Sequence, residues 1–194
     1  MLAFVGRRFG MLSFTCALLA LVCAPAGAQA SGSGGCGNPS LSQPFAPWWD
    51  YSSYELAPGG DFETSSWALS GGAAIVPGSE PYAATGTLGQ YSLSVPAGAS
   101  AESPSACVNA QYPTVRMFVG GTGTVAVSVV YDGVAIPTGV AISAGSWVPS
   151  APMLTQSAIP GLLGGGSAQV SLEVTGLTGS PKVDDVFIDP WGGH

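Results

Sequence analysis

The chain has 194 residues, of which 11 are acidic and only 4 are lysine or arginine, so its formal charge at neutral pH is −7. This excess of negative charge repels phosphate backbones and anionic lipid headgroups, so nucleic acid and acidic membranes are excluded as expected partners. Glycine and proline are frequent, at 29 and 16 residues, and runs of helix-forming residues are scarce. The composition therefore favours short strands and turns over helices.

The first 28 residues have the three parts of a secretory signal peptide. A basic pair, Arg7 and Arg8, precedes an apolar stretch over residues 11–22, and Ala26-Gly27-Ala28 fits the small-x-small rule for cleavage near Ala28. The apolar stretch is short for a membrane span. We therefore predict that residues 1–28 are removed and that the protein is secreted, with no membrane association afterwards. The alternative is an uncleaved membrane anchor.

Cleavage would remove half of the cysteines and half of the basic residues. The remaining chain has two basic and eleven acidic residues, a formal charge of −9. Cys36 and Cys107 are then the only cysteines, in an oxidising compartment, and we predict that they form a disulfide bond. The bond would close a loop of about 70 residues and stabilise the fold by about 4 kcal/mol. It would also attach a flexible, glycine-rich leader, residues 29–44, to the rest of the protein.

Residues 45–194 are predicted to form a single domain, long enough to bury a hydrophobic core. Val170, Leu172 and Val174 alternate with polar residues, which is the period-two pattern of a half-buried strand. Asp132-Gly133 predicts a tight hairpin turn. In chain order, we expect strands at residues 67–76, 90–95, 115–119, 124–131, 134–136, 140–142, 168–174 and 183–188. About eight short strands separated by turns predict an all-β sandwich of two antiparallel sheets.

Two acidic groups lie near opposite ends of this domain, at Gly59-Gly60-Asp61-Phe62-Glu63 and at Val183-Asp184-Asp185-Val186. Strict alternation along the second segment places Asp184 on the same side as Val186 and Ile188. Asp184 would then point into the core, where an unpaired carboxylate is costly. A Ca²⁺ ion bound by Asp184 and by a carboxylate of the first group would compensate the charge. The alternative is that these acids cap turns or accept hydrogen bonds from main-chain N–H groups.

Gly60-Asp61-Phe62-Glu63, followed by Trp67, and the closing Val183-Asp184-Asp185-Val186 resemble the two ends of carbohydrate-binding modules of the cellulose- and xylan-binding type. The resemblance implies a jelly-roll β-sandwich with the galactose-binding-domain fold, in which the early strand pairs with the final strand. It also implies a structural calcium between these strands. Carried over to this chain, the calcium ligands are Glu63 and Asp184, with Asp61 and Asp185 as further ligands.

A second resemblance, to uncharacterised secreted proteins of high-GC Gram-positive bacteria, is closer. It rests on Pro58-Gly59-Gly60-Asp61-Phe62-Glu63, Cys107-Val108, Pro113-Thr114-Val115-Arg116 and the segment from Val183 to Pro190. This resemblance implies no function.

A sugar-binding site needs exposed aromatic rings, because they stack on the C–H faces of pyranose rings. Our candidates are Trp48, Trp49, Tyr82 and Trp147. Two adjacent tryptophans in a strand cannot both face the core, so one is exposed, the pair lies in a loop, or one covers the sandwich edge. Tyr82 lies in an expected loop, Glu80-Pro81-Tyr82, that could add a polar contact.

The sequence predicts no catalytic residues. Its only histidine is His194, the final residue, which is a poor position for a preorganised general base. The leading hypothesis is therefore a secreted, non-catalytic β-sandwich that binds a carbohydrate or cell-wall polysaccharide. The alternative is an extracellular structural or protein-interaction domain without a small ligand.

Overall fold

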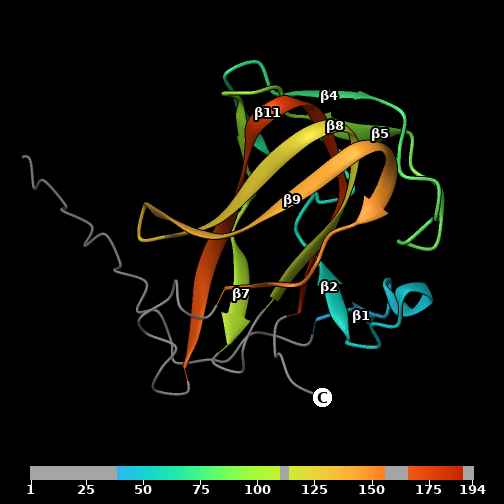
Figure 1. Ribbon diagram of the computed structural model, residues 1–194. Helices are drawn as coiled ribbons and strands as arrows, with labels where there is room; N and C mark the ends of the chain where they lie inside the picture. Colours follow the sequence, from blue (N-terminus) through green and yellow to red (C-terminus); the bar gives the residue numbers. More distant parts are fainter. Residues whose placement is uncertain (1–38, 110–113, 156–165, 190–194) are drawn as a thin grey trace, which may run out of the picture. The chain divides into compact units, whose positions relative to one another are not determined.

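The computed structural model describes residues 39–109, 114–155 and 166–189, and most of these residues lie in strands (Figure 1). The strands are β1 (Leu41–Ser42), β2 (Tyr54–Leu56), β3 (Ala68–Ser70), β4 (Ala74–Pro77), β5 (Tyr91–Ser94), β6 (Ser100–Glu102), β7 (Ala106–Asn109), β8 (Thr114–Tyr131), β9 (Val134–Pro149), β10 (Met153–Leu154) and β11 (Ser167–Asp189). Within these ranges the helical structure is a short 3₁₀ segment, η1 (Ala46–Trp48). All strand pairings are antiparallel. The predicted all-β sandwich is confirmed.

No helix in the described ranges is long and apolar enough to cross a membrane.

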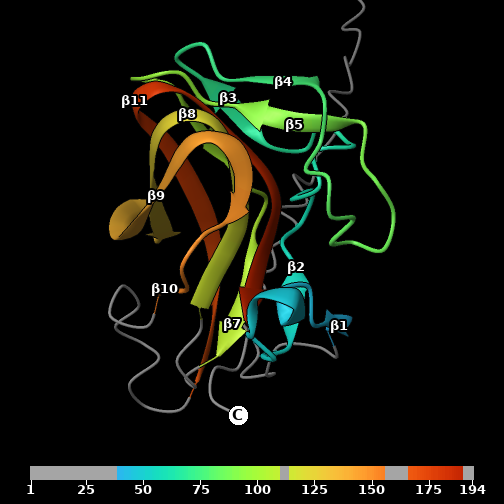
Figure 2. The same ribbon diagram turned by 45° about the vertical axis from the view of Figure 1, so that its right-hand side comes forward.

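Two long strands, β8 and β11, organise the sheet. They pair with each other over almost their whole length, and the other edge of β11 pairs in turn with β7, β6, β5 and β2. Strands β1, β3 and β4 extend the sheet beyond β2, β6 and β5, while β9 and β10 pair with the remaining edge of β8. Figure 2 shows β8, β9 and β11 as strongly curved ribbons. The sheet therefore folds over its own inner face, and the long strands contribute to both layers.

Several segments that the sequence predicts as separate short strands are continuous in the structure. Strand β8 includes residues 115–119 and 124–131, β9 includes 134–136 and 140–142, and β11 includes 168–174 and 183–188. Pairing continues through the glycine-containing segments between them, where Gly121, Gly123 and Gly179 have positive φ. Glycine tolerates this backbone conformation, so a strand can bend there without ending.

Two other local predictions, one of a strand and one of a turn, have different outcomes. Residues 67–76 form two strands, β3 and β4, rather than one. The hairpin turn between β8 and β9 is confirmed, since Asp132 and Gly133 have φ values of 49° and 75°, as a two-residue turn with both central φ values positive requires.

The main core cluster lies on the inner face of the sheet. Leu93 of β5, Val127 of β8 and Leu172 of β11 are buried in it. The alternation predicted for Val170, Leu172 and Val174 is confirmed, because all three belong to this cluster and the residues between them are more exposed.

A second cluster covers the outer face of β8 and β11. Phe118 and Phe187 project from the two strands, and Phe45 and Tyr54 reach them from the segment that contains η1 and β2. The ring of Phe45 stacks on Phe118, with centroids 5.2 Å apart, and meets Tyr54 edge-on at 5.1 Å. This part of β11 is therefore covered on both faces, and residues 183–189 are all buried.

A β-bulge interrupts β11 at Asp185, whose φ is 44°. Asp184 lies opposite Phe118, whereas the next paired residue, Phe187, lies opposite Arg116, so two residues of β11 face one residue of β8. The extra residue reverses the alternation of side chains along the strand.

Because of the bulge, Asp184 faces the opposite side of the sheet from the one predicted. Val186 and Ile188 belong to the main core, but Asp184 shares the outer face with its partner Phe118 of the second cluster. The prediction that Asp184 lies on the same side as Val186 and Ile188 is therefore wrong, because strict alternation does not hold across a bulge.

Candidate functional site

Three of the four aromatic residues predicted to bind a ligand meet on the outer face. The rings of Trp48 and Tyr82 lie edge-on with centroids 4.9 Å apart. Both also contact Phe118, at centroid distances of 5.4 and 5.5 Å. The hydroxyl of Tyr82 donates a hydrogen bond to the main-chain oxygen of Trp147, at 2.7 Å. Together with Trp49, we call Trp48, Tyr82 and Trp147 the aromatic site.

Trp147 of β9 lies against Gly120 of β8. A Cβ atom at Gly120 would be 2.6 Å from Cδ2 of the indole, so the glycine allows the ring to approach the backbone of the strand. Trp147 is half-buried and packs against the second cluster. The sheet itself therefore fixes this member of the aromatic site.

Trp49 differs from its neighbours, because its side chain is 84 % exposed. It is the C-cap of η1, with a left-handed backbone (φ 64°), and its N–H donates to the carbonyl of Ala46 at 3.1 Å. Tyr51 is also exposed, at 59 %, and its carbonyl accepts a hydrogen bond from Nε2 of Gln43 at 2.6 Å. Both the exposure and the left-handed conformation of a tryptophan are unfavourable, so the surrounding contacts must hold this turn.

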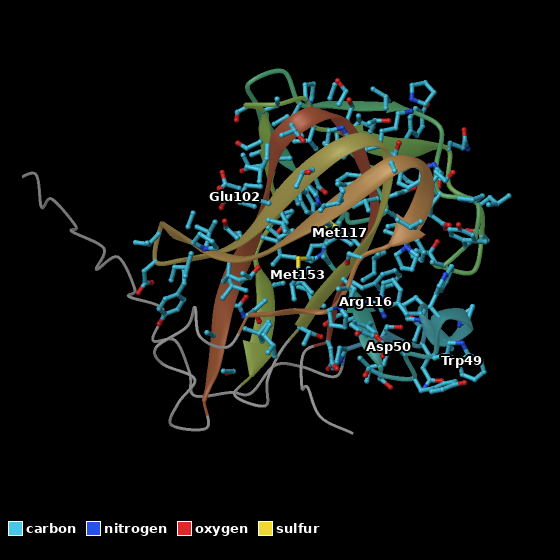
Figure 3. The ribbon with its side chains drawn as sticks, in the orientation of Figure 1. Trp49, Asp50, Glu102, Arg116, Met117 and Met153 are labelled. Atoms are coloured by element: carbon cyan, nitrogen blue, oxygen red, sulfur yellow. The ribbon has the colours of Figure 1, made fainter. Side chains whose placement is uncertain are left out.

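An ion pair between Arg116 of β8 and Asp50 holds the turn against the sheet. Arg116 is buried, and its guanidinium lies 4.1 Å from the centroid of the Phe45 ring. Its Nε and Nη2 atoms donate to the carbonyl of Ser150 at 2.9 and 2.7 Å, while Nη1 donates to Asp50. Figure 3 shows Asp50 and Arg116 close together, with Trp49 farther out. The turn is thereby tied to the strand that carries Phe118.

Hydrogen bonds decide the ionisation of Asp50. Burial opposes its charge, but hydrogen bonds from the hydroxyl of Tyr54, the N–H of Ser52 and the guanidinium of Arg116 outweigh burial and hold its pKa below the ordinary value. Burial and the hydrogen bond to Asp50 raise the pKa of Tyr54. Asp50 is therefore ionised at neutral pH and neutralises Arg116.

Buried acids hold the loop that carries Tyr82, residues 78–90, between β4 and β5. Oδ2 of Asp184 accepts hydrogen bonds from the hydroxyl of Ser79, at 2.7 Å, and from the N–H of Glu80, at 2.8 Å. The carboxylate of Glu80 accepts hydrogen bonds from the N–H groups of Tyr82 and, at 2.9 Å, Ala84. The sequence suggests Glu80 only as a polar contact in a loop, whereas its side chain is 1 % exposed.

The residues predicted to bind calcium are brought together in part. Asp184 and Asp185 are buried, and Asp185 lies within electrostatic reach of Glu80 and Asp61. Oε1 of Glu63 instead accepts the N–H groups of residues 90 and 91, at 2.6 and 3.0 Å. Across the described ranges, no group of three or more His, Cys, Asp or Glu is arranged to hold a metal ion. The observed contacts match the alternative in which the acids accept main-chain hydrogen bonds, and the calcium ligands stay a prediction.

Negative charge accumulates around Asp185. Burial, together with the charges of Asp184 and Glu80 and a hydrogen bond with Glu80, raises the pKa of Asp185 to about 8. Burial also raises the pKa of Asp184 to about 6, although hydrogen bonds from Ser79, Glu80 and Asp185 favour its charged form. No lysine or arginine in the described part of the chain forms an ion pair with these three acids.

Arg116, Asp50 and Phe118 also support the site, although no pattern in the sequence indicated them as site residues. A signal existed for Arg116, which is one of two basic residues after position 28. A buried cation needs a counter-charge, but nothing in the sequence selects Asp50 among the eleven acidic residues.

Several solved structures are similar to this chain. One is TmCBM61 in complex with β-1,4-galactotriose, at 19 % identity and a TM-score of 0.43, covering 67 % of this chain and 94 % of that one. Another is the CBM22-1 xylan-binding domain of Xyn10C from Paenibacillus barcinonensis, at 12 % identity and a TM-score of 0.43, covering 68 % of this chain and 89 % of that one. A third is the C-terminal CBM6 of the laminarinase LamC from Zobellia galactanivorans, at 11 % identity and a TM-score of 0.40, covering 60 % of this chain and 89 % of that one.

No protein-family model matches the chain, and no curated protein matches it. The resemblance to secreted proteins of high-GC Gram-positive bacteria therefore stays a prediction. The signal peptide and Cys36 lie outside the described residues, so export and the disulfide with Cys107 of β7 stay predictions too.

Replacing Asp50 with asparagine should lower the free energy of unfolding by about 2–4 kcal/mol, because Arg116 would remain buried without its counter-charge. Urea denaturation followed by tryptophan fluorescence measures the change. The control is the double variant D50N/R116M, which removes both charges and should be more stable than Asp50→Asn alone. A single variant as stable as the wild type would contradict the role assigned to this pair.

The raised pKa values of Asp184 and Asp185 predict how stability depends on pH. Both acids bind protons more tightly in the folded state than in the unfolded chain, where an aspartate has a pKa of about 3.9. The folded state therefore holds more protons between pH of about 5 and about 8, and the free energy of unfolding falls as pH rises through this range. Urea denaturation in EGTA buffer should show this fall, and Asp185→Asn should reduce it. Stability that rises with pH over the same range would contradict the assignment.

Proposed function

We propose that this chain is an exported, non-catalytic domain that binds a neutral polysaccharide at the aromatic site. Aromatic side chains bind sugars by stacking on C–H faces, and polar groups nearby orient the ligand. The aromatic site supplies exposed ring surface from Trp49, at 84 %, and Tyr82, at 44 %, while Trp48 and Trp147 are half-buried.

The observation that supports the proposal most strongly is the position of Trp49. A mobile exposed tryptophan would have no special meaning, but this one occupies a left-handed turn that a buried ion pair ties to β8. Because the backbone of this turn is held, only the side-chain torsions of Trp49 need to be ordered when it binds a ligand. The turn therefore has the properties of a preorganised stacking surface.

The charge of the chain favours a neutral glycan over an acidic one. In the described residues the basic side chains are Arg116 and Lys182, and Arg116 is buried and paired with Asp50. No arginine at the aromatic site is therefore available to bind a carboxylate or sulfate. Eleven acidic residues also repel a polyanion at long range.

Trp49→Ala tests the proposal, because the exposed ring contributes to binding and not to the core. Retention on insoluble cellulose, xylan and galactan should fall by about tenfold or more, which corresponds to about 1.4 kcal/mol or more. The melting temperature should change little. Pull-down on each polysaccharide measures the first quantity and differential scanning fluorimetry measures the second.

The matched control is Tyr91→Ala, which removes another exposed aromatic ring, on β5 and outside the aromatic site. It should bind like the wild type. Polygalacturonate and hyaluronate serve as acidic probes and should not be retained. A wild-type protein that no polysaccharide retains, or a Trp49→Ala variant that binds as well as the wild type, would overturn the proposal.

A specific observation also favours the alternative, a protein-interaction domain. Val134, Val140 and Ile142 of β9 are each more than half exposed. Residues 134–149 contain no charged residue, and in the described structure β9 pairs with β8 alone. Uncharged, apolar edge strands favour contacts with other chains. In the pull-down experiment, this alternative predicts no retention on any polysaccharide.

We propose in addition that Ca²⁺ is bound by the predicted ligands Asp184, Asp185, Asp61 and Glu63, which must move closer together than they lie in this structure to do so. The support is that Asp184 and Asp185 are buried and form no ion pair with a basic side chain in the described residues, since oxygen ligands and negative charge suit this ion. In this structure Glu80 shares a hydrogen bond with Asp185. A calcium ion bound by Asp185 would have to replace this hydrogen bond.

Calcium should raise the melting temperature of the wild type relative to EGTA, because a ligand of the folded state stabilises it. Asp185→Asn should abolish this increase, and magnesium should be the weaker ion. A melting temperature that is the same in calcium and in EGTA would remove the calcium proposal and leave the sugar proposal untouched.

A further inference from the structure

The loop 78–90 supplies Tyr82 to the aromatic site, and Tyr82 is its central member. Its ring contacts Trp48 and Phe118, and its hydroxyl reaches the carbonyl of Trp147. The conformation of residues 80–84 therefore determines whether the rings of η1 and of β9 form one continuous surface.

One carboxylate lies at the centre of this part of the loop. Oε2 of Glu80 accepts the N–H of Tyr82, and Oε1 accepts the N–H of Ala84 at 2.9 Å. The backbone between them passes through a left-handed residue, Ala83, with φ of 53°. A non-glycine residue in this conformation needs surrounding contacts to hold it, and the two hydrogen bonds to Glu80 supply them.

Glu80 is in turn fixed from outside the loop. Its N–H donates to Oδ2 of Asp184 at 2.8 Å, and the neighbouring hydroxyl of Ser79 donates to the same oxygen at 2.7 Å. Asp184 belongs to β11, where the bulge at Asp185 directs it to the outer face. A continuous set of hydrogen bonds therefore runs from the sheet, through Asp184 and Glu80, to the backbone of Tyr82.

The geometry points to Glu80 as a positioning residue, which sets the ring of Tyr82 against Trp48 without touching the ligand. This inference rests on the proposed function of the aromatic site. The side chain of Glu80 is buried, so it cannot contact a polysaccharide on the surface. Its two oxygens instead accept the N–H groups on either side of Ala83, and the carboxylate also shares a hydrogen bond with the buried Asp185. Each N–H group binds a different oxygen of Glu80, and in glutamine one of these positions is an NH₂ donor that cannot accept a hydrogen bond.

Glu80→Gln should weaken retention on the polysaccharide that binds the wild type by about tenfold or more, similar to Tyr82→Ala. The double variant E80Q/Y82A should bind no more weakly than Tyr82→Ala alone, because Glu80 acts through Tyr82. Measurements in EGTA exclude a contribution from calcium. If Glu80→Gln binds as well as the wild type, or if the two losses add, the inference is overturned.

The control for general destabilisation is Ser103→Ala. The buried hydroxyl of Ser103 accepts the N–H of Leu172 at 2.9 Å, so this variant also removes a buried side-chain acceptor, but outside the loop 78–90. Its melting temperature should fall, while its retention should stay within about twofold of the wild type. A loss of retention equal to that of Glu80→Gln would overturn the inference, because it would show that any loss of stability weakens binding.

A readout without ligand separates this inference from the proposed function. The indole N–H resonance of Trp48, assigned with a Trp48→Phe variant, reports the nearby ring of Tyr82. It should move in Glu80→Gln toward its position in Tyr82→Ala, even if the wild type binds no polysaccharide. An unmoved resonance would overturn the inference. If Glu80→Gln does not fold, Glu80→Asp keeps the charge and withdraws the carboxylate by one methylene, and the same shift is expected.

Discussion

The ion pair between Arg116 and Asp50 is the contact on which the outer face of the sandwich depends. Arg116 is buried on β8, and a buried guanidinium is costly without a counter-charge and further acceptors. Asp50, the carbonyl of Ser150 and the ring of Phe45 supply both. In doing so they bring the η1 segment onto β8 and β11. The second cluster and the Trp48–Trp49 turn follow from this one anchoring contact.

The bulge at Asp185 has a comparable influence on the other side of the aromatic site. It lets Val183 and Val186 both face the main core, although they are three residues apart, and it leaves Asp184 on the outer face. Asp184 then holds the loop that contains Glu80 and Tyr82. The acids that resemble a calcium site thus organise a loop by accepting hydrogen bonds. A strand covered on both faces makes this possible, because the carboxylates are shielded from water.

The members of the aromatic site are positioned by different kinds of structure. The sheet positions Trp147 through Gly120, a capped turn positions the backbone of Trp49, and hydrogen bonds to Glu80 position the backbone of Tyr82. A rigid scaffold with binding residues in loops is a common arrangement, because loops tolerate changes that strands do not. Here the loops are tied to the strands by charged groups, so the charge distribution and the geometry of the site are linked.

By itself, the sequence did not indicate the short strands β1, β2, β6, β7 and β10, but it determined the all-β class, the Asp132-Gly133 hairpin and segments of β5, β8, β9 and β11. These depend on local alternation and turn chemistry, which act within a few residues. Only the tertiary structure decided that predicted strands join into β8, β9 and β11. In a sequence, a glycine is equally compatible with a turn that ends a strand and with a bend inside a continuous strand. It also decided the face of Asp184, the burial of Glu80 and the pairing of Arg116 with Asp50, 66 residues away along the chain. Such contacts join distant segments, and no local pattern encodes them.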